Sequence, residues 1–192
     1  VFVHGGAWEE GDPEIYPFLG RSLARLGHTV AIPAYRLAPE VVFPAFVEDI
    51  AGAAAALRDR LGPERPLVLM GHSAGAQIAA LVTLDPRYLA PHGLTPCGTV
   101  AAFIGIAGPY DFLPLREERY MRVFPEATRP ESQPVAFADG PRPPALLLHG
   151  AEDVVVHAED TEILAARLRE NGNAVTARIY PGVNHVDIIG AV

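Results

Sequence analysis

The sequence predicts an α/β protein in which helices cover both faces of a mostly parallel sheet. Three observations point to this fold class. Short apolar segments of strand length alternate along the chain with longer segments of helical periodicity. The first helical segment follows Asp12-Pro13, a capping residue and a proline that fits the first helical position. Glycines stand where helical segments should end, at Gly27, Gly62 and Gly172.

The elements can be assigned in chain order. We expect strands at residues 1–3, 28–33, 66–70, 99–106, 145–149 and 174–180. We expect helices at residues 14–26, 46–61, 77–84 and 159–170. Because helical crossovers join parallel strands, the carboxyl ends of the strands should meet at one edge of the sheet, where sites form in such folds.

A proline-rich segment interrupts this alternation at residues 109–144. It is too long for an ordinary connection, so we expect an irregular insertion that shapes a site. The whole chain, residues 1–192, has a length and a hydrophobic content of 49% that suit a single α/β domain.

The pentapeptide GHSAG, with Ser73 at its centre, joins an apolar strand to a helical segment. Flanking glycines make room for a sharp, strained turn there, which exposes the serine hydroxyl at the carboxyl edge of the sheet. This context favours a nucleophilic serine. On the pentapeptide alone, a small residue in an ordinary strand–helix turn is the alternative interpretation.

Backbone donors for such a serine are expected from two places. The sequence HGGAW, residues 4–8, follows the first strand, and two successive glycines let N–H groups face a ligand. A serine hydrolase needs donors of this kind for the oxyanion of its tetrahedral intermediate, one from this loop and one from the residue after the serine. We therefore expect an oxyanion hole at Gly5, Gly6 and Ala74.

Two later strand ends carry the acid and the base that a nucleophilic serine requires. Asp153 follows the strand at residues 145–149, and His185 follows the strand at residues 174–180. The order Ser, Asp, His along the chain is the order of nucleophile, acid and base in α/β hydrolases. We expect these residues to form a catalytic triad. Glu152 is the alternative acid, one residue earlier in the turn.

Other histidines near these motifs are expected to be structural. His4, His72 and His149 should pack or hydrogen-bond around the loops rather than transfer protons. His149, Asp153 and His157 are spaced by four residues, but a strand end followed by a loop does not keep helical spacing. We therefore expect no metal site.

With these residues in view, the chain resembles the esterase and lipase group of the α/β-hydrolase superfamily, which includes hormone-sensitive-lipase-like, kynurenine-formamidase-like and feruloyl-esterase-like hydrolases. The matching stretches cover nearly the whole chain and are HGGAW, AYRLAPE, FPAFVEDI, GHSAGAQIAAL, GIAGPYDF, LLLHGAEDVVV and YPGVNHVDI. The resemblance implies that Ser73 is the nucleophile, Asp153 the acid and His185 the base.

Two features depart from the hormone-sensitive-lipase-like pattern. Ala7 stands where those members usually have a third glycine, so the formamidase-like loop with its tryptophan is the closer match. The first N-terminal strands of the group are lacking, and the chain stops soon after His185, so we expect a fragment or a minimal member. A missing N-terminal hairpin would leave a sheet edge unpaired, a liability that formation of a homodimer or instability of the protein would reveal.

We expect a serine hydrolase of carboxylic esters with a short acyl group, acting through an acyl-enzyme without a metal or cofactor. Aromatic residues near the motif loops are the expected pocket walls: Trp8, Tyr35, Tyr110 and Phe112. Two alternatives stay open, an arylformamidase-type amidase and a non-catalytic binding protein with the hydrolase fold. Since the base must be neutral, activity should fall below about pH 6 to 7.

The charge and composition of the chain limit the kinds of partner that it can bind. The formal net charge of −8 argues against nucleic acid and against an anionic membrane surface. No apolar run approaches the roughly 18 residues of a transmembrane helix. Cys97 is the single cysteine, which rules out an intrachain disulfide. We expect a small-molecule ester as partner. A cytoplasmic location is favoured, and a secreted one stays open because the chain does not begin with Met.

Overall fold

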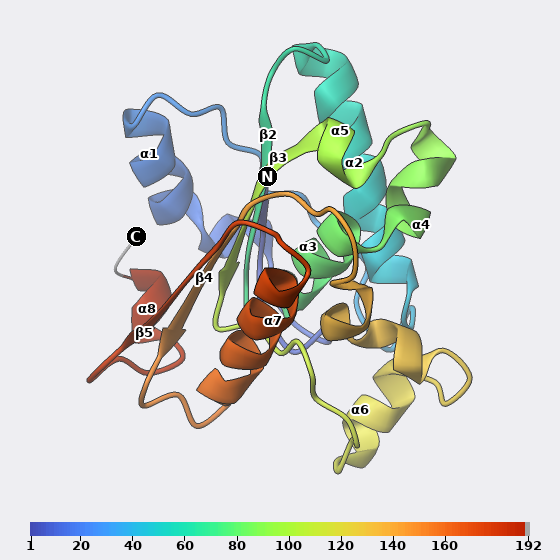
Figure 1. Cartoon of the computed structure of the whole chain (residues 1–192), viewed down its shortest axis with the longest axis vertical. Helices are drawn as coiled ribbons and strands as arrows, with labels where there is room; N and C mark the ends of the chain where they lie inside the picture. Colours follow the sequence, from blue (N-terminus) through green and yellow to red (C-terminus); the bar gives the residue numbers. More distant parts are fainter. Residues whose placement is uncertain (191–192) are drawn as a thin grey trace.

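The computed structural model describes residues 1–190, which form a parallel sheet flanked by helices (Figure 1). The strands are β1 (Phe2–Val3), β2 (Leu67–His72), β3 (Val100–Ile106), β4 (Ala145–Gly150) and β5 (Val175–Tyr180). They lie side by side in the order β1-β2-β3-β4-β5, and each neighbouring pair is parallel. The carboxyl ends of the strands therefore share one edge, as predicted from the alternation of elements.

Helices connect the strands and cover the sheet. The α-helices are α1 (Pro17–Arg25), α2 (Ala45–Leu61), α3 (Ala74–Leu84), α4 (Pro86–Leu89), α5 (Pro96–Thr99), α6 (Glu118–Val123), α7 (Ala158–Glu170) and α8 (Asp187–Gly190). The predicted helices at residues 46–61 and 159–170 are present as α2 and α7.

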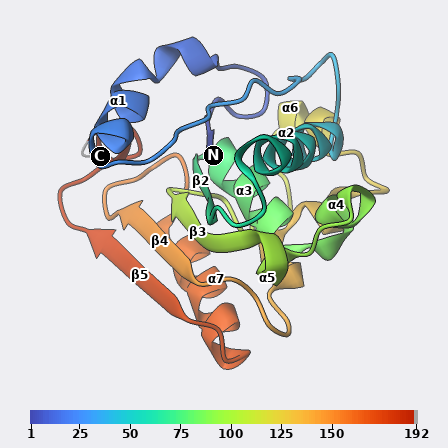
Figure 2. The ribbon, with the colours of Figure 1, turned by 90° about the horizontal axis from the view of Figure 1, so that it is seen from above.

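Both faces of the sheet are covered, as Figure 2 shows from above. The larger apolar core joins the sheet to α2, α3 and α7. A smaller core on the other face joins the sheet to α1 and α8 through Leu19, Ile188 and Ile189. Every residue of α3 is buried, so this helix of mostly small and aliphatic residues packs at the centre of the larger core.

The strand predicted at residues 28–33 is not formed. This segment runs extended beside β1 and accepts one backbone hydrogen bond, from the N–H of Phe2 to the carbonyl of Ala31 at 2.9 Å. Two physical features limit the pairing. β1 is only two residues long, and Pro33 has no N–H to donate to a ladder.

The helix predicted at residues 14–26 is interrupted. A 3₁₀ turn, Pro13–Ile15, is followed by α1, and Tyr16 between them has φ −107° and ψ 28°. The interruption follows from Pro17, because a proline disfavours the helical conformation of the residue before it.

The segment at residues 109–144 is more regular than predicted. It contains α6 and the 3₁₀ helices Arg129–Ser132 and Pro134–Phe137. Helices of four to six residues are too short to show the apolar periodicity that reveals longer helices, which is why the sequence pattern missed them.

Candidate active site

Ser73 occupies the sharp turn between β2 and α3. Its backbone has φ 55° and ψ −125°, a strained conformation for a residue with a side chain. Both flanking glycines are needed because the backbone is crowded. A Cβ on Gly71 would lie 2.2 Å from the carbonyl oxygen of Gly75, and a Cβ on Gly75 would lie 2.1 Å from that of Val3. The turn therefore holds Ser73 at the carboxyl edge of the sheet.

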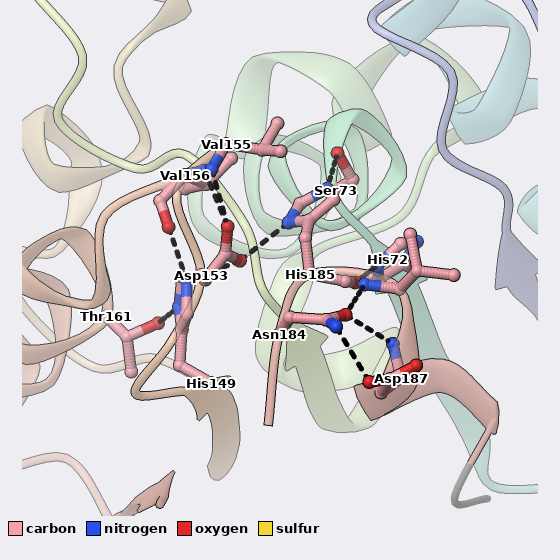
Figure 3. A network of polar contacts seen from close by, with 11 residues as sticks. His72, Ser73, His149, Asp153, Val155, Val156, Thr161, Asn184, His185 and Asp187 are labelled. Atoms are coloured by element: carbon pink, nitrogen blue, oxygen red, sulfur yellow. Dashed lines mark hydrogen bonds and ion pairs between the residues drawn. The ribbon is translucent and has the colours of Figure 1, made fainter. Parts of the chain in front are cut away.

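His185 lies between Ser73 and Asp153 (Figure 3). Its Nε2 is 2.9 Å from Ser73 Oγ, and its Nδ1 is 2.6 Å from Asp153 Oδ2. The three residues come from loops after β2, β4 and β5, so the parallel sheet brings them together. Glu152 is exposed, whereas the Asp153 side chain is fully buried and bonded to His185.

Both carboxylate oxygens of Asp153 have hydrogen-bond partners. Its Oδ1 accepts the N–H groups of Val155 and Val156, each at 2.9 Å. Its Oδ2 faces His185 and also His149 Nε2, at 3.1 Å. Burial by itself raises the pKa of Asp153, but the donors Val156, His185 and Val155 outweigh it, and the pKa lies below its usual value. Asp153 is therefore an anion at neutral pH.

Two histidines outside the predicted triad contact it. His149 is fully buried at the end of β4, with Nδ1 2.8 Å from Thr161 Oγ1 on α7. His72, the residue before the serine, donates from Nε2 to the carbonyl of His185 at 2.8 Å. Burial lowers the pKa of His72 to about 4, so it stays neutral. Both stand at strand ends and hydrogen-bond to the neighbouring loops or helices, as predicted, but nothing in the local pattern indicated that they contact the triad itself.

The predicted oxyanion-hole residues lie around Ser73. A Cβ on Gly5 would be 3.1 Å from the Cβ of Ser73, so this loop passes directly beside the serine. The carbonyl of Gly6 accepts the N–H groups of Glu9 and Glu10, which closes the loop into a tight turn. Within residues 1–190, the N–H groups of Gly6 and Ala74 have no hydrogen-bond acceptor and are free to serve a ligand.

Ala7 was missed as a site residue. It adopts φ 53°, and it lines the cavity next to the serine together with Ala74. The signal was present in the sequence: this is the position of the third glycine in the hormone-sensitive-lipase-like loop, where a positive φ is natural.

A cavity of about 490 Å³ opens beside Ser73. Of the predicted aromatic walls, Trp8 and Phe112 line it, with Tyr120 beside them. The Trp8 indole donates to Gln77 Oε1 at 3.0 Å, which fixes the orientation of its ring.

Tyr35 and Tyr110 do not line this cavity, which differs from the expectation. Tyr35 supports the first loop from behind, since its hydroxyl donates to the carbonyl of His4 at 2.9 Å and its ring stacks on His4. Tyr110 is fully buried, with its ring filling the space left by Gly105 and Gly108. Nearness to a motif in sequence did not reveal which way either ring points.

Charged residues also line the cavity, among them Asp111 and Asp160. Burial raises the pKa of Asp160 to about 6. The backbone N–H of Tyr110 opposes this rise and the charge of Asp111 adds to it. This part of the cavity therefore carries a carboxylate that changes charge close to neutral pH.

Within residues 1–190, no group of three or more His, Cys, Asp or Glu side chains is arranged to hold a metal ion. Among the same residues, no helix is both long and apolar enough to cross a membrane.

A parallel sheet with a serine at a tight strand–helix turn, followed by an aspartate and a histidine at later strand ends, defines the α/β-hydrolase class. The family model described as the alpha/beta hydrolase fold matches residues 1–188. The chain belongs to this family.

Several curated proteins are similar in sequence. Esterase LipC of Mycobacterium tuberculosis is 32% identical over 96% of this chain and 52% of LipC. A probable isoprenylcysteine alpha-carbonyl methylesterase of Oryza sativa subsp. japonica is 29% identical, over 98% of this chain and 50% of the relative. A kynurenine formamidase of Meyerozyma guilliermondii is 28% identical, and the match covers 100% of this chain and 76% of the relative. The chain thus spans about half the length of the first two relatives.

Among solved structures, the apo form of Thermogutta terrifontis esterase 2 superimposes with a TM-score of 0.81. The match covers 96% of this chain and 72% of that chain at 24% sequence identity. Similarity at this level shows a shared fold.

Proposed function

We propose that this protein is a serine hydrolase that cleaves carboxylic esters with a short acyl group. The observation that carries the proposal is the pair of hydrogen bonds that joins Ser73 Oγ to His185 and His185 to Asp153, at 2.9 and 2.6 Å. Esterase relatives in the same family support this class of reaction.

In the acylation step, His185 Nε2 takes the proton of Ser73 while Oγ attacks the carbonyl carbon of the ester. The carbonyl oxygen becomes an oxyanion, which the N–H groups of Gly5, Gly6 and Ala74 stabilise, with Ala7 of the same loop lining the cavity beside them. Collapse of the tetrahedral intermediate breaks the bond to the alcohol oxygen, and His185 returns the proton to that oxygen. The products are the alcohol and an acyl-enzyme.

In the deacylation step, water attacks the acyl carbon and His185 takes a proton from it. In the second tetrahedral intermediate the bond between the acyl carbon and Ser73 Oγ breaks, and His185 returns its proton to Oγ, which leaves the carboxylic acid and free Ser73. Asp153 remains an anion throughout, and its charge stabilises the imidazolium form of His185 in both steps.

A short acyl group fits the surroundings of the serine. The cavity of about 490 Å³ must hold both the acyl and the alcohol portion, and bulky side chains such as Trp8 and Phe112 form part of its wall. The related fold of Thermogutta terrifontis esterase 2 is described with propionate and with butyrate bound, acids of three and four carbons.

The test is intact-mass measurement after incubation with a fluorophosphonate, with S73A as the control. We expect a single stoichiometric adduct on the wild-type protein and none on S73A, followed by hydrolysis of p-nitrophenyl esters that declines with acyl chain length. A folded wild-type protein that forms no adduct contradicts the proposal and supports a non-catalytic binding protein.

An arylformamidase activity is the second candidate, because kynurenine formamidases of yeast and fly are among the relatives. The same nucleophile and base cleave an N-formyl bond. Comparing kcat/KM for N-formylkynurenine with that for p-nitrophenyl butyrate separates the two: a preference for the ester supports the esterase, and a clear preference for the formamide supports the amidase.

A further inference from the structure

We propose that His149 is a positioning residue of this site, whose imidazole N–H anchors the second carboxylate oxygen of Asp153 so that it faces His185, and that Thr161 orients the His149 ring. This inference rests on the proposed hydrolase function. Figure 3 shows the three side chains in one chain of contacts that ends at His185.

The hydrogen-bond partners of His149 determine its tautomer. Its Nε2 is 3.1 Å from Asp153 Oδ2 and 3.0 Å from the carbonyl oxygen of Val156. Both neighbours only accept hydrogen bonds, so Nε2 must carry the hydrogen. The ring is neutral, because burial lowers its pKa more than the contacts with Val156 and Asp153 raise it. Nδ1 is then an acceptor, and the Thr161 hydroxyl donates to it at 2.8 Å.

The contact has a specific effect on the acid. The two backbone N–H groups of Val155 and Val156 hold Oδ1 of Asp153 but leave Oδ2 without a rigid partner. His185 bonds Oδ2, yet it must also move a proton to and from Ser73. His149 is therefore the fixed donor on Oδ2, since its own ring is fully buried and held at both nitrogens.

His149 also limits how strongly Asp153 attracts a proton on His185. A donor to Oδ2 withdraws part of the negative charge that faces His185, without adding a positive charge of its own. One other titratable group near this pair is His72 of β2, whose ring centroid lies 4.9 Å from that of His185; the uncharged Ser73 hydroxyl faces His185 Nε2. Asp187, the first residue of α8, accepts a hydrogen bond from Asn184.

The first experiment compares H149L with H149Q. Leucine removes the donor, whereas the side-chain N–H of glutamine replaces the Nε2 hydrogen. For H149L we expect kcat per active site to fall about tenfold, the size of effect that a hydrogen bond to a charged group has. KM should change little. The acidic limb of the kcat/KM profile should move up by about half a pH unit, because Asp153 would then favour the protonated base more strongly. H149Q should restore most of the wild-type kcat and most of the wild-type position of the acidic limb.

The second experiment compares T161V with T161S. Valine removes the hydroxyl at nearly constant side-chain volume, whereas serine keeps it. T161V should move kcat and the acidic limb in the same direction as H149L by a smaller amount, and T161S should resemble the wild type. This pair keeps the proposal testable even where H149L fails to fold.

Active sites are counted in every variant by fluorophosphonate adduct, so loss of folded protein is separated from loss of turnover. A purely structural role for His149 lowers the adduct yield and leaves kcat per adduct and the acidic limb unchanged, which overturns the positioning role. An unlabelled, inactive wild-type protein is the different result that overturns the proposed hydrolase function instead.

Discussion

At the scale of single residues, the Asp160 side chain beside the cavity lowers the stability of the folded protein when it is charged. Its pKa is raised to about 6, mainly by burial. An acid whose pKa is higher in the folded state binds its proton more tightly there, so that contribution to stability is present at low pH. It is lost as pH rises from the ordinary value near 4 through 6. At neutral pH the folded state therefore holds a partly buried negative charge next to Asp111.

We expect D160N to be more stable than the wild type at pH 7.5, by on the order of 1 kcal/mol after allowance for solvent screening. The gain should shrink as pH falls toward 4, since the wild-type carboxyl becomes neutral as well. Urea unfolding at several pH values measures it. E159Q removes the same charge at the exposed neighbouring position and should show little gain. An equal gain in both variants would contradict the burial argument.

At the scale of elements, the close approach of α3 to β1 positions the serine turn. Gly75 in the first turn of α3 lies so near the end of β1 that a Cβ would lie 2.1 Å from the carbonyl oxygen of Val3 and 2.4 Å from that of His4. Both obstacles are backbone atoms, which cannot rotate away. The glycine is therefore required by packing between two elements rather than by its own φ.

We expect G75A to lose about 3 kcal/mol or more of unfolding free energy, because the helix must shift away from the sheet. G52A on α2 is the matched control, since its Cβ would meet only His92 Cε1 at 3.8 Å. That substitution should stabilise the protein by about 0.5–1 kcal/mol through helix propensity. Chemical denaturation followed by circular dichroism measures both. A wild-type stability for G75A would show that the approach is looser than described.

At the scale of the whole molecule, the helices on the two faces of the sheet differ in whether they adjoin the loop that carries His185. α2 packs in the larger core, and α8 belongs to the smaller one and follows His185 directly. Opening of α8 would therefore release the loop that carries the base, whereas loosening of α2 would leave that loop in place.

We expect I188A on α8 and I50A on α2 to lose a similar amount of stability, about 2–4 kcal/mol each. Their effects on activity should differ. In urea well below either unfolding midpoint, I50A should react with fluorophosphonate at the wild-type rate, and I188A should react several times more slowly. Equal rates in the two variants would mean that α8 does not hold the His185 loop.

Much of this fold and site follows from local sequence patterns. The alternation of apolar and amphipathic segments predicted the parallel sheet with helices on both faces. The tight turn at Ser73 could be predicted from its two glycines and from the strand and helix beside it, because those signals lie within a few residues. Asp153 and His185 could be predicted as neighbours because parallel topology brings strand ends to one edge.

Other features could not be predicted from local patterns. Residues 28–33 have the composition of a strand, but pairing depends on what β1 offers across space. Tyr110 turns into the core and Trp8 lines the cavity, although both lie next to motifs. The contacts of His149 with Asp153 and Thr161 depend on how β4, its following loop and α7 pack. The sharp turn at Ser73 follows from the residues next to it, because φ, ψ and turn chemistry are local. Only the folded structure determined which side chains surround it, because those contacts join residues that are distant along the chain.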